Sequence, residues 1–316
     1  TNTDINNNID DKIQGIKENL SQYTANIDQQ VQILEKQIRE SNERNFQDCN
    51  YLKNDLIQQK RLIRMFMEEA QQRLPENMSI GQLQTFVQEK ANQRDAFYVA
   101  FEDRFRGSRE DIRNRLKIYL PLLQSAKVRA MDAPLLDLGC GRGEWLELLR
   151  ESGYQARGVD SNQVMIGQCQ ARGLDVFEAN ALSYLKSLPD LSLSAVTGFH
   201  LIEHLPFEQL LELLEETMRV LCPGGMIIFE TPNPRNILVG SGDFYRDPTH
   251  NNPIHPDTIS YIASLEGFVQ AESYFFREQQ GCLELVAASE IKFDDLNSYV
   301  TVSRDFALVG YKLYKP

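Results

Sequence analysis

The segment from Leu135 to Glu144, LLDLGCGRGE, constrains the fold of this chain more than any other part of it. An apolar run ends in the acid Asp137, and a turn with three glycines then opens a helical pattern. Glycine lets the backbone turn tightly after a strand and lets a ligand approach where a side chain would stand in the way. The spacing is Gly-x-Gly-x-Gly, not the Gly-x-Gly-x-x-Gly of dinucleotide sites, and no Gly-Lys-Ser/Thr follows to hold a triphosphate. The turn therefore indicates a nucleotide-like cofactor other than NAD or ATP.

A second acid, Asp160, ends the next expected strand, which begins at Ala156. In doubly wound α/β folds, a carboxylate at this place accepts hydrogen bonds from the two hydroxyls of a ribose. Asp137 and Asp160 are thus both expected at strand ends. Together they predict a cofactor that contains adenosine.

These residues resemble the class I S-adenosylmethionine-dependent methyltransferases, whose first motif corresponds to Asp137 through Gly143. Three later segments agree with the same family in order: Glu178–Leu182 (EANAL), Phe199–His204 (FHLIEH) and Leu221–Gly225 (LCPGG). The resemblance covers roughly residues 133–290. It implies that the chain is an enzyme with S-adenosylmethionine as its cofactor and a Rossmann-like, seven-stranded, doubly wound α/β sheet as its fold.

The resemblance also implies which residues contact the cofactor. They are Asp137, Gly139, Cys140, Gly141, Gly143, Asp160, Ser161, Asn180, Ala181 and Phe199, together with Arg106 before the core. Arg106 could hold the cofactor carboxylate as a bidentate clamp, and a solvated arginine fits this position equally well. Many relatives carry aspartate where Asn180 stands, so the carbonyl of Asn180 would have to accept the adenine amino group. Trp145 and Phe199 could stack on adenine or a sugar, although each also fits a core position.

Beyond residue 133, expected strands alternate with helical patterns, which is typical of a doubly wound α/β sheet. Because ligands in open α/β sheets bind outside the carboxyl ends of the strands, the loops that follow the first five strands should form one cleft. The strands are expected at 134–138, 156–159, 175–179, 193–199, 226–231 and 269–276, with 306–314 as the seventh, antiparallel strand of the family.

Methyl transfer to a hydroxyl needs an acceptor oxygen in line with the methyl group and a base that takes the proton. Histidine titrates closest to neutral pH, and His204 follows the fourth expected strand, where similar methyltransferases use a histidine as base. We therefore expect His204, with its neighbour Glu203, to be catalytic. A helix-capping or other structural role for His204 stays open with equal weight.

The polar segment 243–256 follows the fifth expected strand and is long enough to form a lid over a substrate. Asp247 and His250 could form a catalytic pair in which the carboxylate fixes the imidazole tautomer, or both could satisfy hydrogen bonds of the turn. The run Asp-Pro-Thr-His followed by Pro-x-His-Pro resembles methyltransferases of bacterial polysaccharide and O-antigen biosynthesis, including enzymes that cap a chain by methylating its terminal sugar. That resemblance implies a sugar hydroxyl of a bacterial surface glycan as the acceptor.

We expect no metal ion at the site. Glu203, His204, His250 and His255 could together bind a divalent cation, but no ligand spacing enforces such a site. The five cysteines are scattered, odd in number and without Cys-x-x-Cys spacing, which argues against both a zinc site and a disulfide framework. We therefore expect a reducing, cytoplasmic compartment.

Charge and hydropathy limit the partners further. The net charge of −12 would repel phosphate backbones, so we expect no nucleic-acid partner. No run approaches the ~20 apolar residues that span a bilayer, and the start shows no signal-peptide pattern. We therefore expect contact with the inner face of a membrane only through partners.

The first part of the chain has a different pattern. Residues 5–38 place isoleucine, leucine, valine and tyrosine three and four positions apart, which is the seam of a coiled coil. The seam weakens at 41–45 and then resumes. We expect a coiled coil over 1–74, a helical linker over 75–130 and a methyltransferase domain over 131–316. The coil should form a homo-oligomer, or else space or dock the enzyme against a partner such as a glycosyltransferase.

Two hypotheses compete with a glycan acceptor. A small aromatic or isoprenoid acceptor would need a lid more apolar than Tyr245–Asp247 and His250–Asn252. A coiled-coil scaffold that binds the cofactor without turnover would fit Asn180 as a mark of decay, but the intact glycine turn and Asp160 count against it.

Overall fold

The computed structural model describes residues 107–128, 132–279 and 282–314. The expected coiled coil, most of the expected linker and Arg106 lie outside the described residues, so they stay predictions. Within the described ranges, no helix is long and apolar enough to cross a membrane.

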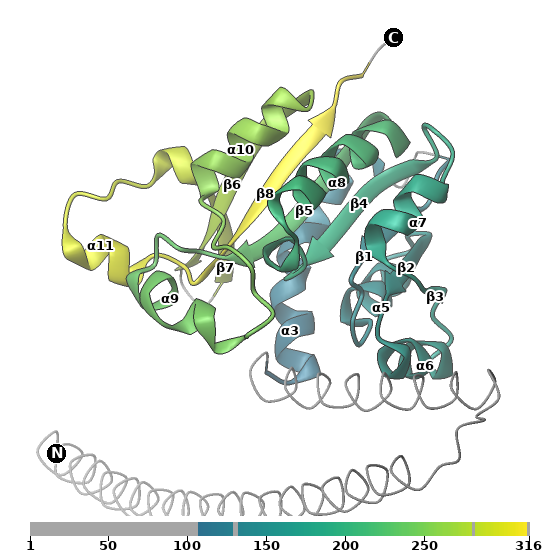
Figure 1. Ribbon diagram of the computed structural model, residues 1–316, viewed down its shortest axis with the longest axis horizontal. Coiled ribbons are helices and arrows are strands. Elements are labelled where there is room, and N and C mark those ends of the chain that lie inside the picture. The colour runs from purple at the N-terminus through teal and green to yellow at the C-terminus, as the bar shows by residue number, and fades with distance from the viewer. Residues whose placement is uncertain (1–106, 129–131, 280–281, 315–316) are drawn as a thin grey trace, which may run out of the picture. The chain divides into compact units, whose positions relative to one another are not determined.

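The described residues form one mixed sheet of eight strands in the order β3-β2-β1-β4-β5-β8-β6-β7 (Figure 1). The strands are β1 Leu135–Leu138, β2 Ala156–Asp160, β3 Val176–Glu178, β4 Leu193–Phe199, β5 Leu221–Pro232, β6 Phe268–Gln279, β7 Cys282–Ala287 and β8 Asp305–Lys312. Strands β1 to β5 run parallel, and β8 runs antiparallel between β5 and β6. The Rossmann-like α/β sheet and its antiparallel closing strand agree with the expectation from the sequence.

The expectation of seven strands is wrong by one edge strand. Strand β7 pairs with β6 in antiparallel register, for example Val286 with Phe275. Leu283 and Glu284, which follow each other in β7, are both exposed. The segment therefore lacks the alternation of buried and exposed residues that marks a half-buried strand in a sequence.

Helices cover both faces of the sheet, as a doubly wound fold requires. They are α3 Arg109–Leu116, η1 Lys117–Tyr119, α4 Leu120–Ser125, α5 Glu144–Glu151, α6 Gln163–Ala171, α7 Ala181–Ser187, η3 Ile202–His204, α8 Phe207–Val220, α9 Ile237–Ser241, η4 Asp243–Arg246, α10 Pro256–Leu265, η5 Ala288–Glu290 and α11 Leu296–Thr301. Successive strand residues point to opposite faces. Leu136 and Ile227 accordingly join the core under α7, α8 and α10, which lie in front of the sheet in Figure 1. Leu135 and Ile228 join the core under α3, α4 and α5.

The described helices that precede β1, which are α3, η1 and α4, belong to the core of the sheet domain. Tyr119 and Leu123 are completely buried. The ring of Tyr119 lies 6.3 Å from that of Trp145 and 5.4 Å from that of Phe199. The part of the predicted linker that the structure describes therefore packs with the sheet and shares its apolar core.

The glycine turn joins β1 to α5 through three residues with left-handed backbone. The φ angles are +64° at Gly139, +50° at Gly141 and +78° at Gly143. At Gly143 the surroundings also exclude a side chain, because a Cβ atom would lie 2.6 Å from Leu174 Cδ1 and 2.8 Å from Cys169 Sγ. Gly143 is thus required by packing as well as by the backbone.

We expect Gly143→Ala to destabilise the domain. The left-handed backbone costs an L-residue about 1–2 kcal/mol, and the two close contacts add an overpacking cost of about 1–3 kcal/mol. The free energy of unfolding, measured by urea denaturation, should therefore fall by roughly 2–5 kcal/mol.

Gly167→Ala is the matched control. Gly167 lies inside α6 and has nothing within 4 Å of its would-be Cβ. Alanine should raise the free energy of unfolding by up to ~1 kcal/mol through its better helix propensity. Equal effects of the two substitutions would contradict the packing argument for Gly143.

Candidate active site

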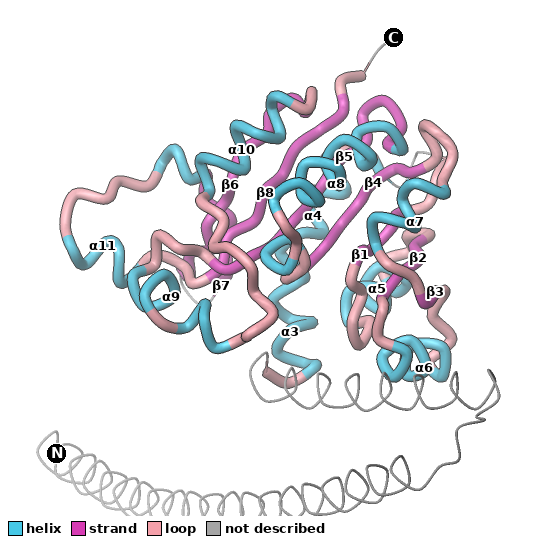
Figure 2. The backbone as a smooth tube through the Cα atoms, in the orientation of Figure 1, coloured by secondary structure: helices cyan, strands magenta, loops and turns pink. Residues whose placement is uncertain are grey.

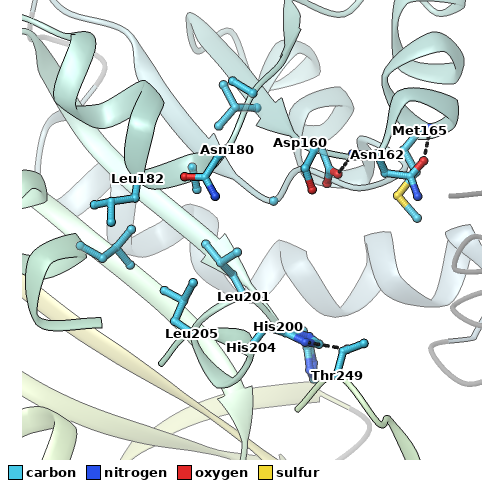
Figure 3. Close-up of a pocket in the computed structure, with 16 residues that line it drawn as sticks. Asp160, Asn162, Met165, Asn180, Leu182, His200, Leu201, His204, Leu205 and Thr249 are labelled. Atoms are coloured by element: carbon cyan, nitrogen blue, oxygen red, sulfur yellow. Dashed lines mark hydrogen bonds between the residues drawn. The ribbon is translucent and has the colours of Figure 1, made fainter. Parts of the chain in front are cut away.

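A cavity of about 420 Å³ lies at the carboxyl ends of β1, β2, β3 and β4 (Figure 3). Five of the residues that were predicted to contact the cofactor line it: Gly139, Asp160, Ser161, Asn180 and Ala181. His200, Leu201, His204 and Thr249 line the side away from Asp160. The volume falls within the ~300–1,000 Å³ typical of small-ligand sites. The cleft expected at these strand ends is therefore present.

Two backbone amides fix the carboxylate of Asp160 at the end of β2. Oδ2 accepts a hydrogen bond from the amide of Gly141 (2.9 Å), and Oδ1 accepts one from the amide of Asn162 (2.8 Å). A carboxylate oxygen can accept more than one hydrogen bond, so both oxygens can also receive hydroxyl protons from a ligand. The glycine turn and the acid thus form one rigid unit, whose chemistry fits a ribose diol.

Asp137 lies beneath the turn and does not line the cavity. It is 2% exposed, and its Oδ1 accepts a hydrogen bond from the hydroxyl of Thr197 (2.7 Å). That hydroxyl in turn accepts a hydrogen bond from Trp145 Nε1 (3.1 Å). The side chain therefore ties β1 to β4 and α5. Four other predicted cofactor contacts are likewise absent from the cavity lining: Cys140, Gly141, Gly143 and Phe199.

Trp145 and Phe199 are core residues. Their rings meet edge to face with centroids 5.5 Å apart, and their exposed fractions are 2% and 8%. Of the two alternatives that the sequence left for them, core packing is the one observed. Stacking of Trp145 on adenine or a sugar is excluded, because its ring is enclosed and its N–H already donates within the core.

Asn180 lines the cavity and also caps the helix that follows it. Its Oδ1 accepts a hydrogen bond from the amide of Ser183 (3.1 Å) and so caps the N-terminus of α7. The amide –NH₂ group is then the donor that Asn180 can offer to a ligand. Asparagine is a favoured N-cap residue, and because its carbonyl oxygen has a second lone pair, acceptance of the adenine amino group by Asn180 stays a prediction.

His204 ends the short helix η3 after β4 and forms part of the cavity wall. Its Nδ1 lies 2.9 Å from the hydroxyl of Thr249. Burial lowers the pKa of His204 below its usual 6.5, and His250 adds to this effect, whereas Glu203 and Asp247 oppose it. The neutral ring, which is the form that can accept a proton, is therefore favoured near pH 7.

Glu203 is completely buried and supports its neighbours from behind. Its Oε1 lies 3.1 Å from His200 Nδ1, and its Oε2 accepts the hydroxyl proton of Thr231 (2.9 Å). Burial alone would raise the pKa of Glu203, but the hydrogen bond and charge of His200 outweigh burial and lower it. The carboxylate is thus an ionised structural group and is not among the residues that line the cavity.

His200 links this acid to a second one, Glu230 of β5. Its Nε2 lies 3.4 Å from Glu230 Oε1, which Arg115 Nη2 also approaches (3.2 Å). The hydroxyl of Tyr119 donates to the other oxygen of Glu230. Burial would raise the pKa of Glu230, but His200 and Arg115 lower it to about 2. His200 itself adopts a left-handed backbone (φ +57°).

The chain between α9 and α10 runs mostly as loop around η4 (Figure 2). The expected hydrogen bond between Asp247 and His250 is not formed, because His250 Nε2 and Asp247 Oδ2 are 4.0 Å apart. The carbonyl of Phe244 accepts from His250 Nδ1 instead (2.7 Å) and so fixes the tautomer of that ring. Asp247 Oδ1 accepts from both the amide (2.8 Å) and the hydroxyl (2.6 Å) of Thr249.

His255 has a structural place outside the cavity. Its Nδ1 accepts a hydrogen bond from the amide of Asp257 (3.3 Å) and caps the N-terminus of α10. It does not join the other histidines. Ligand-type atoms of Glu203, His204 and His250, by contrast, lie within 4.8 Å of one another, a donor set that a divalent cation could bridge.

Sequence reasoning did not single out His200 or Thr249 as site residues. His200 stood in the quoted FHLIEH segment, but its role depends on Glu230, a distant acid in β5. Thr249 lies between two residues that were singled out, and its hydroxyl is what joins Asp247 to His204. The sequence did contain one indication of a buried polar network, because Glu230 is an acid inside the otherwise apolar strand β5.

Comparison with known proteins agrees with this geometry. Residues 106–271 match the methyltransferase domain family. A probable S-adenosylmethionine-dependent methyltransferase of Mycolicibacterium smegmatis is 27% identical over 161 residues, which are 50% of this chain and 61% of that protein. The ubiquinone biosynthesis O-methyltransferase of Idiomarina loihiensis is 30% identical over 108 residues, which are 33% of this chain and 43% of that protein. The chain thus spans less than two thirds of either relative.

A solved structure covers more of the chain. The crystal structure of an S-adenosylmethionine-dependent methyltransferase from Archaeoglobus fulgidus matches with a TM-score of 0.58 and 35% identity. The match covers 68% of this chain and 100% of that one. With a family match over more than half of its length, the chain belongs to the S-adenosylmethionine-dependent methyltransferases.

Proposed function

We propose that this chain methylates a hydroxyl group of a sugar and that His204 is the base that takes the hydroxyl proton. The observation that carries the proposal is the position of His204, a half-buried histidine with a lowered pKa in the wall of the same cavity as Asp160. Transfer to oxygen needs a proton acceptor at the reacting end of the cofactor site. His204 lines the cavity with a ring that is neutral near pH 7 and can therefore take the proton.

The lining of the cavity fits the cofactor. Asp160 would accept the ribose hydroxyls, and the amide of Asn180 and the side chains of Met165 and Leu182 would surround the adenine. Gly139 keeps the turn open, since a Cβ there would lie 3.2 Å from Leu201 Cδ1. The cofactor supplies a methyl group made electrophilic by its attachment to a positively charged sulfur. The protein then has to align the acceptor and remove its proton.

The residues around the far wall support a polar acceptor. His200, His204 and Thr249 line it together with the apolar Leu201 and Leu205 (Figure 3), and Tyr245 and Arg246 in the adjoining loop are exposed. A sugar hydroxyl needs hydrogen-bond partners of this kind, which a wholly apolar acceptor would not use. The narrower proposal, capping of a bacterial surface glycan, rests on the resemblance of the segment Asp247 to Pro256. A coiled coil that oligomerises or spaces the enzyme is part of that same narrower proposal.

A divalent cation is a second candidate for activating the hydroxyl. The donor atoms of Glu203, His204 and His250 within 4.8 Å favour it. A cation there would lower the pKa of a bound hydroxyl and so reduce the need for a base. It would have to compete with His200 and Thr231, which already hydrogen-bond Glu203.

Asp160→Ala should weaken binding of S-adenosylhomocysteine, measured by calorimetric titration. Hydrogen bonds to a charged group contribute about 1.5–3 kcal/mol each, so we expect the Kd to rise by at least about tenfold. Asp175→Asn is the control, because Asp175 directly precedes β3 and so lies at the amino ends of the parallel strands, whereas the cavity lies at their carboxyl ends. An unchanged Kd in Asp160→Ala, with its melting temperature preserved, would remove Asp160 from the cofactor site.

His204→Gln should lower kcat for methyl transfer to a sugar by about 10²–10⁴-fold, the usual effect of losing a general base. The Kd for S-adenosylhomocysteine should stay within about twofold, because His204 lies on the acceptor side. His255→Gln, the control, should retain full activity. The assay is transfer of labelled methyl groups to a panel of oligosaccharides, phenols and isoprenoid quinols. Transfer to phenols or quinols alone would contradict the sugar proposal, and cofactor binding without transfer would favour the scaffold hypothesis.

Chelation distinguishes proton removal by His204 from activation of the hydroxyl by a bound cation. If His204 acts as a base by itself, dialysis against EDTA should leave the transfer rate unchanged. A rate that falls at least tenfold and returns with added Zn²⁺ or Mn²⁺ would establish the second candidate, since imidazole ligands suit Zn²⁺ and carboxylate ligands suit Mn²⁺.

A further inference from the structure

We propose that Thr249 and Asp247 are positioning residues that hold the proton of His204 on Nδ1 and thereby present Nε2 as the base. The inference rests on the proposed function of His204. Three side chains form a chain of contacts that starts at the cavity wall and ends in the loop, and Figure 3 shows its first link, from His204 to Thr249.

The direction of each hydrogen bond follows from the chemistry of the groups. The hydroxyl of Thr249 lies 2.6 Å from Asp247 Oδ1 and 2.9 Å from His204 Nδ1. A carboxylate can only accept and a hydroxyl has one proton to give, so Thr249 donates to Asp247. Its contact with His204 must then be one in which Nδ1 carries the proton and donates. In a neutral imidazole the other nitrogen, Nε2, is consequently the proton acceptor.

The opposite tautomer of His204 would break this series of hydrogen bonds. If Nδ1 lacked a proton, the hydroxyl of Thr249 would have to turn toward it and give up Asp247. A hydrogen bond to a carboxylate is among the stronger ones in a protein, so this exchange is unfavourable. The loop therefore selects the tautomer in which Nε2 is the base.

Backbone contacts keep Thr249 in register with His204. The amide of Thr249 donates to Asp247 Oδ1 (2.8 Å), which shapes the turn around the hydroxyl. The amide of Asn251 donates to the carbonyl of Glu203 (2.9 Å), and its side-chain amide donates to the carbonyl of His204. The loop is thus attached to η3 through Asn251 as well as through Thr249. The arrangement is built from several independent contacts.

His250 and Glu203, which lie beside His204, each have hydrogen-bond partners of their own. The ring of His250 packs against it with centroids 4.8 Å apart, but His250 Nδ1 donates to the carbonyl of Phe244. Glu203 directs its two oxygens to His200 and Thr231. The hydroxyl of Thr249 is accordingly well placed to accept the proton of His204 Nδ1.

Thr249→Val and Thr249→Ser test the assignment. Valine keeps the shape of threonine and removes the hydroxyl, so kcat should fall about 10–100-fold, as when a residue that orients a catalytic histidine is lost. The KM for S-adenosylmethionine and for the acceptor should change less than about twofold, since a residue that orients a base acts on kcat. Serine keeps the hydroxyl and should restore at least half of kcat. Thr301→Val, which removes an exposed hydroxyl in α11, is the control and should not change kcat.

A spectroscopic measurement tests the tautomer without turnover. The chain has four histidines, so ¹⁵N-histidine labelling and His204→Gln identify the signals of His204. At pH 8 the native protein should show the Nδ1–H tautomer, and Thr249→Val should show a mixture. A native Nε2–H tautomer, or full kcat in Thr249→Val, would overturn the inference. Full activity of His204→Gln would instead overturn the proposed function. The tautomer measured in the native protein does not depend on that result, so the two failures can be told apart.

Discussion

Parallel strands that end at one edge of the sheet are the constraint on which the whole site depends. Strands β2, β1 and β4 are neighbours and run in the same direction. Asp160, the glycine turn and His204 each follow their own strand, and the sheet brings them to one cavity although they belong to separate βα units. Each βα unit contributes one short turn to the site, and the sheet already requires these turns to connect its strands and helices.

A layer of buried charge supports the acceptor side of that cavity. Glu203 and Glu230 both remain ionised because His200, Arg115 and Tyr119 hold them, whereas an unpaired buried carboxylate would cost several kcal/mol. The same layer sets the basicity of His204. Burial lowers its pKa, and Glu203 opposes burial, so the ring stays neutral near pH 7 without losing its capacity to take a proton.

Local patterns predicted the features that depend on local chemistry. The glycine turn, Asp160 and the parallel strands follow from short stretches of sequence, the antiparallel direction of the last strand was implied by the family resemblance, and the structure has all of them. The features that were missed depend on contacts across the chain. Asn180 caps its own helix, Asp247 hydrogen-bonds Thr249 instead of His250, and the edge strand β7 has almost no pattern of its own. Tertiary packing decides which group each of these residues or strands pairs with, and residue propensity and spacing do not predict it.

The central claim is that cofactor and acceptor meet in the cavity between Asp160 and His204. A crystal structure of the protein with S-adenosylhomocysteine tests it most directly. The account predicts ribose hydroxyls on the carboxylate of Asp160, adenine beside Asn180, and the sulfur atom on the side of the cavity that leads to His204. A cofactor bound outside this cavity, or one whose sulfur points away from His204 and is closed off from that ring, would contradict it.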